Sequence, residues 1–169
     1  MPELVVPTTS VHRSWLDALA EPDYDPRWAD DLDIDRLTDP AEFATFVAGQ
    51  RAQATEDAPR PTGWVPTTYL WYVDGASFLG RLSIRHRLTQ WLHDYGGHIG
   101  YDVRPSARRR GHATAMLQAA LPWCRKLHID PALVTCDVDN VASRKVIERA
   151  GGKFDDERDG KLRYWVPAS

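Results

Sequence analysis

The chain has 169 residues, of which 43% are hydrophobic and 27% charged, a balance typical of a folded domain and not of a disordered chain. No segment approaches the roughly 20 apolar residues that a membrane span needs, and a net charge of −3 argues against a nucleic-acid partner. Two cysteines, Cys124 and Cys136, are too few for a disulfide framework, and the first residues lack a basic and apolar leader. We therefore expect a cytoplasmic protein with no membrane partner.

Two helices and an acidic loop are expected in the N-terminal part. Apolar residues at helical spacing predict a helix over residues 12–21, and residues 22–38 indicate an irregular loop. Asp39-Pro40-Ala41-Glu42 combines an N-cap aspartate, a first-turn proline and the glutamate of a capping box, so a second helix should begin there and end near Glu56. Residues 58–66 contain three prolines and a glycine and are expected to be loop.

Charge is unevenly distributed along the chain. From Asp17 to Glu42 there are 10 acidic and 2 basic residues, whereas basic residues outnumber acidic ones in the remainder. This pattern suits a main body that binds an anionic cofactor and an N-terminal segment that meets a cation. A solvated acidic loop is the alternative.

The rest of the chain alternates strands and helices. Aromatic and β-branched residues predict strands at 68–73 and 76–85, joined by a type I′ turn at Asp74-Gly75. The elements expected after this hairpin are a helical turn at 87–95 ended by Gly96-Gly97, a strand at 98–103, a helix at 111–127 with a kink or break at Pro122, a strand at 132–138, a helix at 141–150 and a strand at 161–166. This order, α-α-β-β-β-α-β-α-β, predicts one domain of the mixed α/β class.

A strand that runs into a basic loop and then a helix carries the clearest functional signal. Val103 ends the strand, Arg108, Arg109 and Arg110 follow, and Gly111 opens the helix. Backbone N–H groups at such a helix start attract a phosphate, and a glycine there allows close approach. A solvated basic turn is the alternative.

This segment resembles the acyl-CoA-binding motif of the GNAT superfamily of N-acetyltransferases, Val-x-Pro-x-x-Arg/Gln-x-x-Gly-x-Gly/Ala. The residues at its positions are Val103, Pro105, Arg108, Gly111 and Ala113. Asn140-Val141-Ala142-Ser143 is similar to the family's Asn-x-x-Ser segment. The resemblance implies an α+β type of fold, a mixed, mostly antiparallel sheet flanked by helices. It also implies one domain over residues 1–169, with a variable acceptor side at 1–66 and an acyl-CoA-binding core at 67–169.

The resemblance further implies acetyl-CoA as the cofactor. Its pyrophosphate would be held beside Arg108 by the segment Arg109, Arg110, Gly111, His112, Ala113 and Thr114. The main chain of Tyr101 and Val103 would pair with the pantetheine arm like an added strand. Asn140 would hydrogen-bond that arm, and Ser143 would support it or cap the helix.

Two departures from the family pattern leave the catalytic groups open. Many relatives have a proton-donating tyrosine where this chain has Ile147, so the thiolate would leave unaided or take a proton from Tyr101 or Tyr164. Where relatives place a base, only His98 titrates near neutral pH. This histidine is either catalytic or structural, and positioning with a water relay is a further alternative.

We therefore predict an acetyl-CoA-dependent N-acetyltransferase that acetylates a primary amine by direct transfer in a ternary complex. The acidic segment favours a cationic small-molecule acceptor. The alternatives are acetylation of a protein or peptide amine, a non-catalytic acyl-CoA-binding sensor, and a toxin that acetylates aminoacyl-tRNA, the last disfavoured by the net charge of −3. A homodimer is left open.

A group of histidines and a group of aromatic residues are the remaining candidates for a binding role. His86, His93 and His98 match no standard zinc spacing, so no metal site is expected. The aromatic residues Tyr69, Trp64, Trp71 and Trp91 are candidates either for the wall of an acceptor pocket or for the core.

Overall fold

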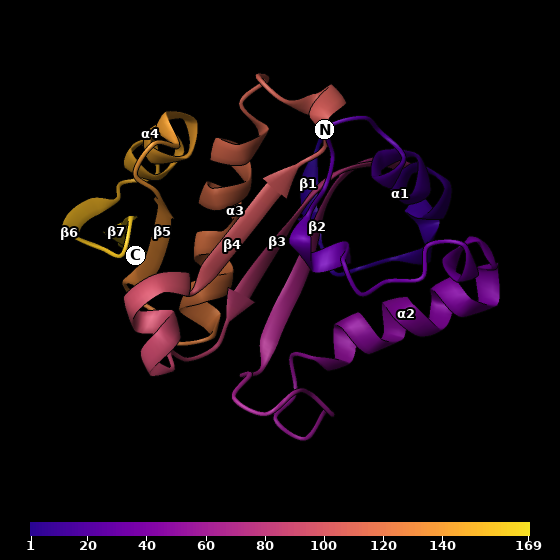
Figure 1. Cartoon of the computed structure of the whole chain (residues 1–169), viewed down its shortest axis with the longest axis horizontal. Helices are drawn as coiled ribbons and strands as arrows, with labels where there is room; N and C mark the ends of the chain where they lie inside the picture. The colour runs from indigo at the N-terminus through magenta and orange to yellow at the C-terminus, as the bar shows by residue number, and fades with distance from the viewer.

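The computed structural model describes residues 1–169 and contains one sheet of seven strands in the order β1-β2-β3-β4-β5-β7-β6 (Figure 1). The strands are β1 Glu3–Val5, β2 Thr67–Asp74, β3 Ser77–Arg85, β4 Ile99–Val103, β5 Ala132–Asp137, β6 Lys153–Arg158 and β7 Lys161–Val166. The helices are α1 His12–Leu19, α2 Pro40–Ala52, α3 His112–Lys126 and α4 Val141–Arg149. Neighbouring strands are antiparallel except β4 and β5, which confirms the predicted mixed, mostly antiparallel sheet with flanking helices. None of these helices has the length and apolar character to span a bilayer.

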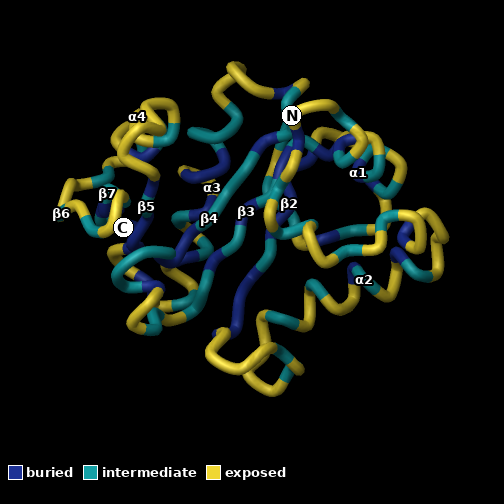
Figure 2. Tube along the Cα trace, viewed as in Figure 1, coloured by how far each residue is buried: buried dark blue, intermediate teal, exposed yellow.

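Helices cover both faces of the sheet, and each face has its own hydrophobic core. On one face Trp71 packs with Trp15 of α1 and Phe43 of α2, at the right of Figure 1. On the other face Leu70 belongs to the core that contains Met116 of α3. Side chains alternate along a strand, so β2 contributes to both cores. Figure 2 shows the buried residues concentrated in the strands and on the inner sides of the helices.

Helix α3 has the predicted buried face but not the predicted break. Met116, Leu117, Ala120 and Cys124 are all buried. The helix continues through Pro122 to Lys126. Apolar residues pack into the core on both sides of the proline, and we attribute the continuity to this packing, which outweighs the lost backbone hydrogen bond.

Two predicted boundaries differ in detail. The Asp39 side chain accepts a hydrogen bond from the Glu42 N–H as expected, but α2 ends at Ala52 and not near Glu56. The Gln53 carbonyl oxygen accepts from the Thr67 N–H and the Arg60 side chain, and not from a further helical N–H. The hairpin of β2 and β3 is present, yet its two turn residues are Gly75 and Ala76. Only Gly75 has a positive φ, 58°, as in a type II′ turn and not the expected type I′.

The sequence does not predict strands β1 and β6. β1 has three residues at one edge of the sheet. β6 reads Lys-Phe-Asp-Asp-Glu-Arg at the other edge, a mostly charged sequence without the β-branched residues typical of strands. It forms a hairpin with β7 through the two-residue turn Asp159-Gly160, whose φ values of 48° and 82° are those of a type I′ turn, and the ion pair of Asp156 with Arg163 adds to this pairing.

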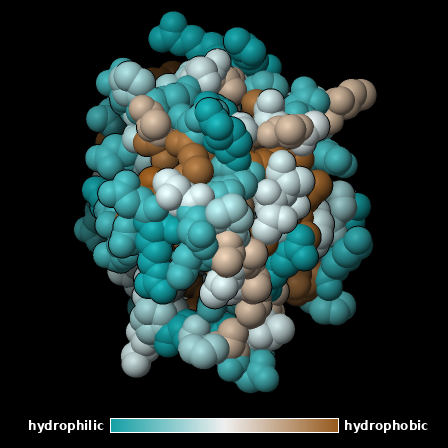
Figure 3. Space-filling view, turned by 90° about the vertical axis from the view of Figure 1, so that its right-hand side faces the viewer, coloured by the Kyte–Doolittle hydropathy of each residue, from teal (hydrophilic) through white to brown (hydrophobic).

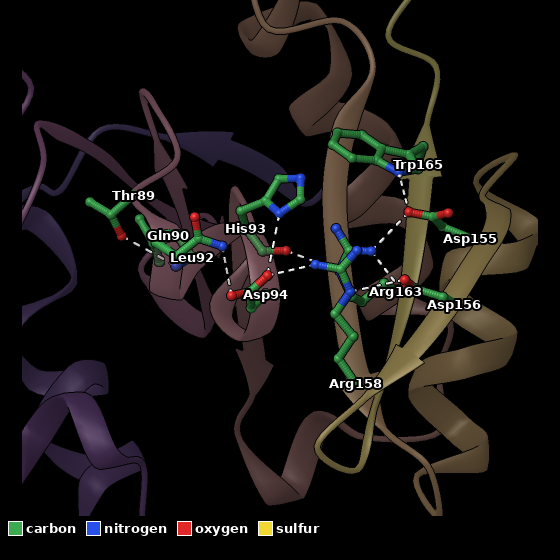
Figure 4. Close-up of polar contacts among 10 residues, drawn as sticks. All are labelled: Thr89, Gln90, Leu92, His93, Asp94, Asp155, Asp156, Arg158, Arg163 and Trp165. Carbon is green, nitrogen blue, oxygen red and sulfur yellow. Dashed lines mark hydrogen bonds and ion pairs between the residues drawn. The ribbon is translucent and has the colours of Figure 1, made fainter.

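A buried arginine joins the helical turn before β4 to the β6–β7 hairpin (Figure 4). Arg163 of β7 is completely buried; its Nε donates to the His93 carbonyl oxygen and its Nη1 lies 2.5 Å from the Asp156 carboxylate. Arg158 adds a second link, 2.6 Å from Asp94. The turn that leads into β4 is therefore fastened to the end of the sheet.

Strands β4 and β5 separate after a short contact. They share one register pair, Ile99 with Val134, whereas β3 pairs with β4 along the whole strand. Gly97 precedes this contact with a φ of 71°, and a Cβ there would lie 2.8 Å from the Leu133 carbonyl oxygen, so the close approach requires glycine. Beyond it the strands diverge and leave an opening in the sheet.

Candidate active site

The loop between β4 and α3 presents unpaired backbone N–H groups. Arg109 and Gly111 have positive φ values of 63° and 78°, and Gly111 is the N-cap of α3. None of the N–H groups from Arg109 to Thr114 donates a hydrogen bond to the protein. A Cβ on Gly111 would meet nothing within 4 Å, so this backbone is open to a ligand. Consecutive free N–H groups at a helix start bind anions, and the loop fits a pyrophosphate.

The arginines of this loop have different roles in the structure. Arg108 Nε donates to the Val103 carbonyl oxygen at 3.0 Å and stabilises the turn. Arg109 and Arg110 are exposed and make no ion pair with the protein. His112 packs edge-on against the ring of Tyr72 with 5.5 Å between ring centroids. Arg109 and Arg110 are thus the side chains available to a phosphate.

The edge of β4 that faces the opening also has unpaired backbone groups. The His98 carbonyl oxygen and the Arg104 N–H both bond to β3. In an antiparallel pair this direction alternates, so the backbone groups of Tyr101 and Val103 point away from β3 and toward the opening. Strand β5 does not pair with them. Their N–H groups fit an extended chain such as a pantetheine arm.

Helix α4 begins beside this opening. Asn140 is its N-cap and accepts a hydrogen bond from the Ser143 N–H at 3.1 Å, which leaves the Asn140 side-chain amide N–H groups without a protein partner. The Ser143 hydroxyl lies 2.6 Å from that of Tyr101, so the contact connects β4 to the helix that follows β5. Burial raises the pKa of Tyr101 to about 12, and its hydroxyl is protonated at neutral pH.

His98 occupies the closed end of the opening. It is 8% exposed, and its Nδ1 accepts a hydrogen bond from the Leu133 N–H at 2.9 Å. Burial lowers the pKa of His98 to about 4, so the ring is neutral at pH 7. Its basic nitrogen is engaged between β4 and β5, and His98 lines neither cavity described below. Ile147 is completely buried in the core under α4.

A cavity of about 750 Å³ lies between β2, β3, α2 and the loops around them. A second cavity of about 260 Å³ shares Arg81, Ser83 and Arg85 with it and reaches Tyr101 and Asp102 on β4. Figure 3 shows the side of the molecule that carries α1 and α2, where hydrophilic residues dominate and hydrophobic ones form small separate patches. The two cavities together form a path to β4.

Three of the four aromatic candidates line this path. Tyr69, Trp64 and Trp91 lie in the wall of the larger cavity, and the latter two are exposed. Trp71 has the other predicted role, as a core residue: it is buried beneath α1 and α2.

The structure corrects the basis for a cationic acceptor. The segment Asp17–Glu42 contributes Arg27, Trp28 and Leu32 to the larger cavity and none of its acids. Several of those acids have structural partners elsewhere: Asp17 pairs with Arg13, Glu21 with Arg104 and the Ser106 N–H, Asp39 caps α2, and Glu42 pairs with Arg36. The charged groups that line the larger cavity are arginines.

Asp102 is the carboxylate of the smaller cavity, and sequence reasoning missed it. The Tyr24 hydroxyl and the Trp28 Nε1 donate to its two oxygens at 2.5 and 2.7 Å. Burial raises the pKa of Asp102. Asp102 holds the loop at 22–38 against β4. Its hydrogen bonds with Tyr24 and Trp28 join residues more than seventy positions apart, so no local sequence pattern predicts them.

A family model described as "Acetyltransferase (GNAT) domain" matches residues 12–153. The chain belongs to the GNAT acetyltransferases. It is therefore an acetyltransferase, and acetyl-CoA is its cofactor. A comparison with curated protein sequences gives no match.

Solved structures share the fold of this GNAT acetyltransferase at low sequence identity. Mycobacterium smegmatis RimJ, in complex with CoA-disulfide, has a TM-score of 0.64 and 21% identity over 98% of this chain and 81% of that chain. A putative ribosomal-protein-serine acetyltransferase from Vibrio cholerae has a TM-score of 0.63 and 14% identity over 98% and 93%. Campylobacter jejuni N-acetyltransferase PseH, in complex with acetyl coenzyme A, has a TM-score of 0.59 and 12% identity over the full length of both chains.

The geometry fits the cofactor of a GNAT acetyltransferase. The run of free N–H groups from Arg109 to Thr114 suits a pyrophosphate, and the N–H groups of Tyr101 and Val103 suit a strand-like arm. Both lie on the same side of the opening, because β4 leads directly into the loop.

Proposed function

We propose that this protein is an N-acetyltransferase that transfers an acetyl group to a primary amine by direct reaction in a ternary complex. The observation that carries the proposal is the meeting of two paths at β4. The N–H groups of Tyr101 and Val103 point toward the opening beside β5, and the smaller cavity reaches Gly100 and Tyr101 from the β3 side. One path suits the donor and the other the acceptor, so both can be bound at once.

We assign donor binding to residues around the opening. The N–H groups of the segment Arg109–Thr114 hold the pyrophosphate, with Arg109 and Arg110 adding charge. The backbone of Tyr101 and Val103 pairs with the arm. The amide of Asn140 hydrogen-bonds it from the start of α4.

Acetyl-CoA supplies the acetyl group as a thioester. A free N–H of β4, that of Tyr101 or of Val103, donates to the carbonyl oxygen and polarises it. The cavities contain no histidine, lysine or glutamate, and both oxygens of Asp102, their one carboxylate, accept hydrogen bonds from Tyr24 and Trp28. Proton removal from the amine is therefore assigned to water and catalysis chiefly to positioning. The Tyr101 hydroxyl, protonated and bonded to Ser143, donates the proton that the departing thiolate takes up.

Thermal unfolding with and without acetyl-CoA tests donor binding. A ligand at a hundred times its dissociation constant adds about 2.7 kcal/mol of stability, which for a chain of this size raises the melting temperature by on the order of 5–10 °C. Desulfo-coenzyme A and ATP are the controls. The absence of any shift would overturn the proposal.

A screen of primary amines for thiol release then tests catalysis. Tyr101→Phe should lower kcat by about 100-fold and leave the acetyl-CoA shift in place. Tight binding with no thiol release from any amine would favour an acyl-CoA sensor. Reaction with peptide amines alone would favour a protein acceptor.

A further inference from the structure

We propose that the amine acceptor also carries an anionic group, a carboxylate or a phosphate, and that Arg81 binds this group together with Arg85 and Arg27. The inference rests on the proposed function, because it names the class of amine that the same site acetylates.

Arg81 is a cation held inside the protein without a hydrogen-bonding partner. Its guanidinium carbon lies 4.7 Å from the ring centroid of Trp28 and 4.4 Å from that of Tyr69. Its Nε is buried and makes no hydrogen bond. The two rings interact with the faces of the guanidinium, but the N–H donors in its plane still need an acceptor. Arg81 lines both cavities, so a ligand can supply one.

The carboxylate opposite Arg81 does not satisfy it. Arg81 and Asp102 are register partners, yet the oxygens of Asp102 accept from Tyr24 and Trp28 and form no ion pair with Arg81. An unpaired buried charge is unfavourable. Burial lowers the pKa of Arg81, which agrees with an incompletely compensated cation. Recognition of an anion gives a reason for an arginine at this position.

Two more guanidinium groups line the same space. Arg85 uses Nη1 for the carbonyl oxygens of Gly96 and Gly97, at 3.0 and 3.1 Å, and its Nε and Nη2 have no protein partner. Arg27 is exposed and makes no ion pair. The larger cavity contains no acidic side chain. Guanidinium groups bind carboxylates and phosphates through paired hydrogen bonds, so this set favours an anion.

The size and remaining walls of the cavity restrict the acceptor further. Its volume of about 750 Å³ lies within the range of small-molecule sites. Trp64 and Trp91 add apolar surface near the entrance. With its anionic group at Arg81, the acceptor can extend its amine toward Gly100 and Tyr101 along the smaller cavity.

The first experiment compares amines that differ only in the anionic group, with the unaltered protein and saturating acetyl-CoA. One pair is an amino acid and its amide; another is an amino sugar and its phosphate ester. The anionic member should have a kcat/KM at least about 10-fold higher, and the two pairs distinguish carboxylate from phosphate. Equal rates, or preference for the uncharged members, would overturn the inference while leaving the proposed function intact.

Variants identify the residue responsible. Arg81→Gln should raise KM for the anionic amine by about 10- to 100-fold, with KM for its uncharged partner and the acetyl-CoA melting shift unchanged. Arg149→Gln, at an exposed position in α4, is the matched control and should change neither constant. Arg27→Gln is a second, exposed variant that removes charge without disturbing the interior. It should raise the same KM by a smaller factor.

A binding measurement separates this inference from the proposed function. With coenzyme A present to fill the β4–α3 loop, inorganic phosphate or succinate should raise the melting temperature more than chloride at equal ionic strength. Arg81→Gln should abolish that difference. If Arg81→Gln abolishes the difference and no amine leads to thiol release, the anion site is supported and the proposed function fails. If phosphate and succinate act like chloride on the unaltered protein, the inference fails.

Discussion

Gly111 has a backbone conformation that only glycine adopts without strain, and open space in front of it. Gly111→Val should lower the free energy of unfolding by about 1–2 kcal/mol, because φ is 78° there. It should also weaken acetyl-CoA binding, because the new side chain projects toward the place where a phosphate meets the free N–H groups. Denaturant unfolding and the acetyl-CoA melting shift measure the two effects.

Gly160 provides the control for that substitution. It has a φ of 82°, no neighbour within 4 Å of an added Cβ, and a position in the β6–β7 turn. Gly160→Val should cost similar stability and leave the acetyl-CoA shift unchanged. Equal losses of acetyl-CoA binding in both variants would contradict a specific role for Gly111.

His98 makes stability depend on pH. Its pKa is about 4 in the folded protein and 6.5 in an unfolded chain, so between these values the unfolded chain binds the proton and the folded protein does not. Stability should therefore fall as pH decreases from 6.5 toward 4, by up to about 3 kcal/mol. His98→Asn keeps an acceptor for the Leu133 N–H and should flatten this dependence in urea unfolding curves. A catalytic His98 would in addition place an inflection near pH 4 in kcat/KM.

Sequence patterns predict the conformation of the β4–α3 loop better than the walls of the cavities. The residues from Arg109 to Thr114 are adjacent in the chain, so their geometry is local and a short pattern predicts it. Arg81 and Asp102 meet through strand pairing, and Trp28 joins them from a distant loop. No spacing within one segment encodes that arrangement.

The turn before β4 depends on the buried guanidinium of Arg163. Arg163→Met should reduce the free energy of unfolding by about 1–3 kcal/mol, because the His93 carbonyl oxygen loses its buried donor, whereas the exposed carboxylates of Asp155 and Asp156 remain hydrated. Urea denaturation measures the loss. Arg144→Met removes an exposed ion pair with Glu148 and should cost less than about 1 kcal/mol. Comparable losses of unfolding free energy in the two variants would show that the buried Arg163 contributes no more to stability than an exposed ion pair.

Elements with a local signal are predicted well, and those defined by long-range pairing are not. The Asp39 cap and the apolar face of α3 are properties of their own residues. β1 is a strand because β2 pairs with it from more than sixty residues away. β6 does have a local signal, the two-residue turn Asp159-Gly160 that joins it to β7, but the mostly charged sequence of the strand conceals it. The predicted turn at Asp74-Gly75 lies one residue before the observed turn at Gly75-Ala76. The register of β2 with β3 sets the position of the turn, and the Asp-Gly pair does not.

The whole molecule is built around an opening between two parts of one sheet. On one side of it are β1 to β4 and on the other β5 to β7, joined at Ile99 and Val134. Acetyl-CoA bound there should slow hydrogen exchange of the backbone N–H groups of Tyr101, Val103 and the segment Arg109–Thr114. Amides of the β2–β3 hairpin away from the opening are the internal control. Uniform slowing across the chain would indicate general stabilisation and not binding at the opening.

This arrangement gives the sheet inner edges at β4 and β5 as well as its two outer ones, and they differ in their risk of pairing with a strand of another molecule. The outer edges are guarded: β1 is three residues long, and β6 carries charges along most of its length. The inner edge of β4 has free N–H groups but lies in the middle of the sheet, where β4 is joined to β5 at Ile99 and Val134, and not at its rim. The molecule can thus keep an unfilled edge for a slender ligand without becoming a template for aggregation.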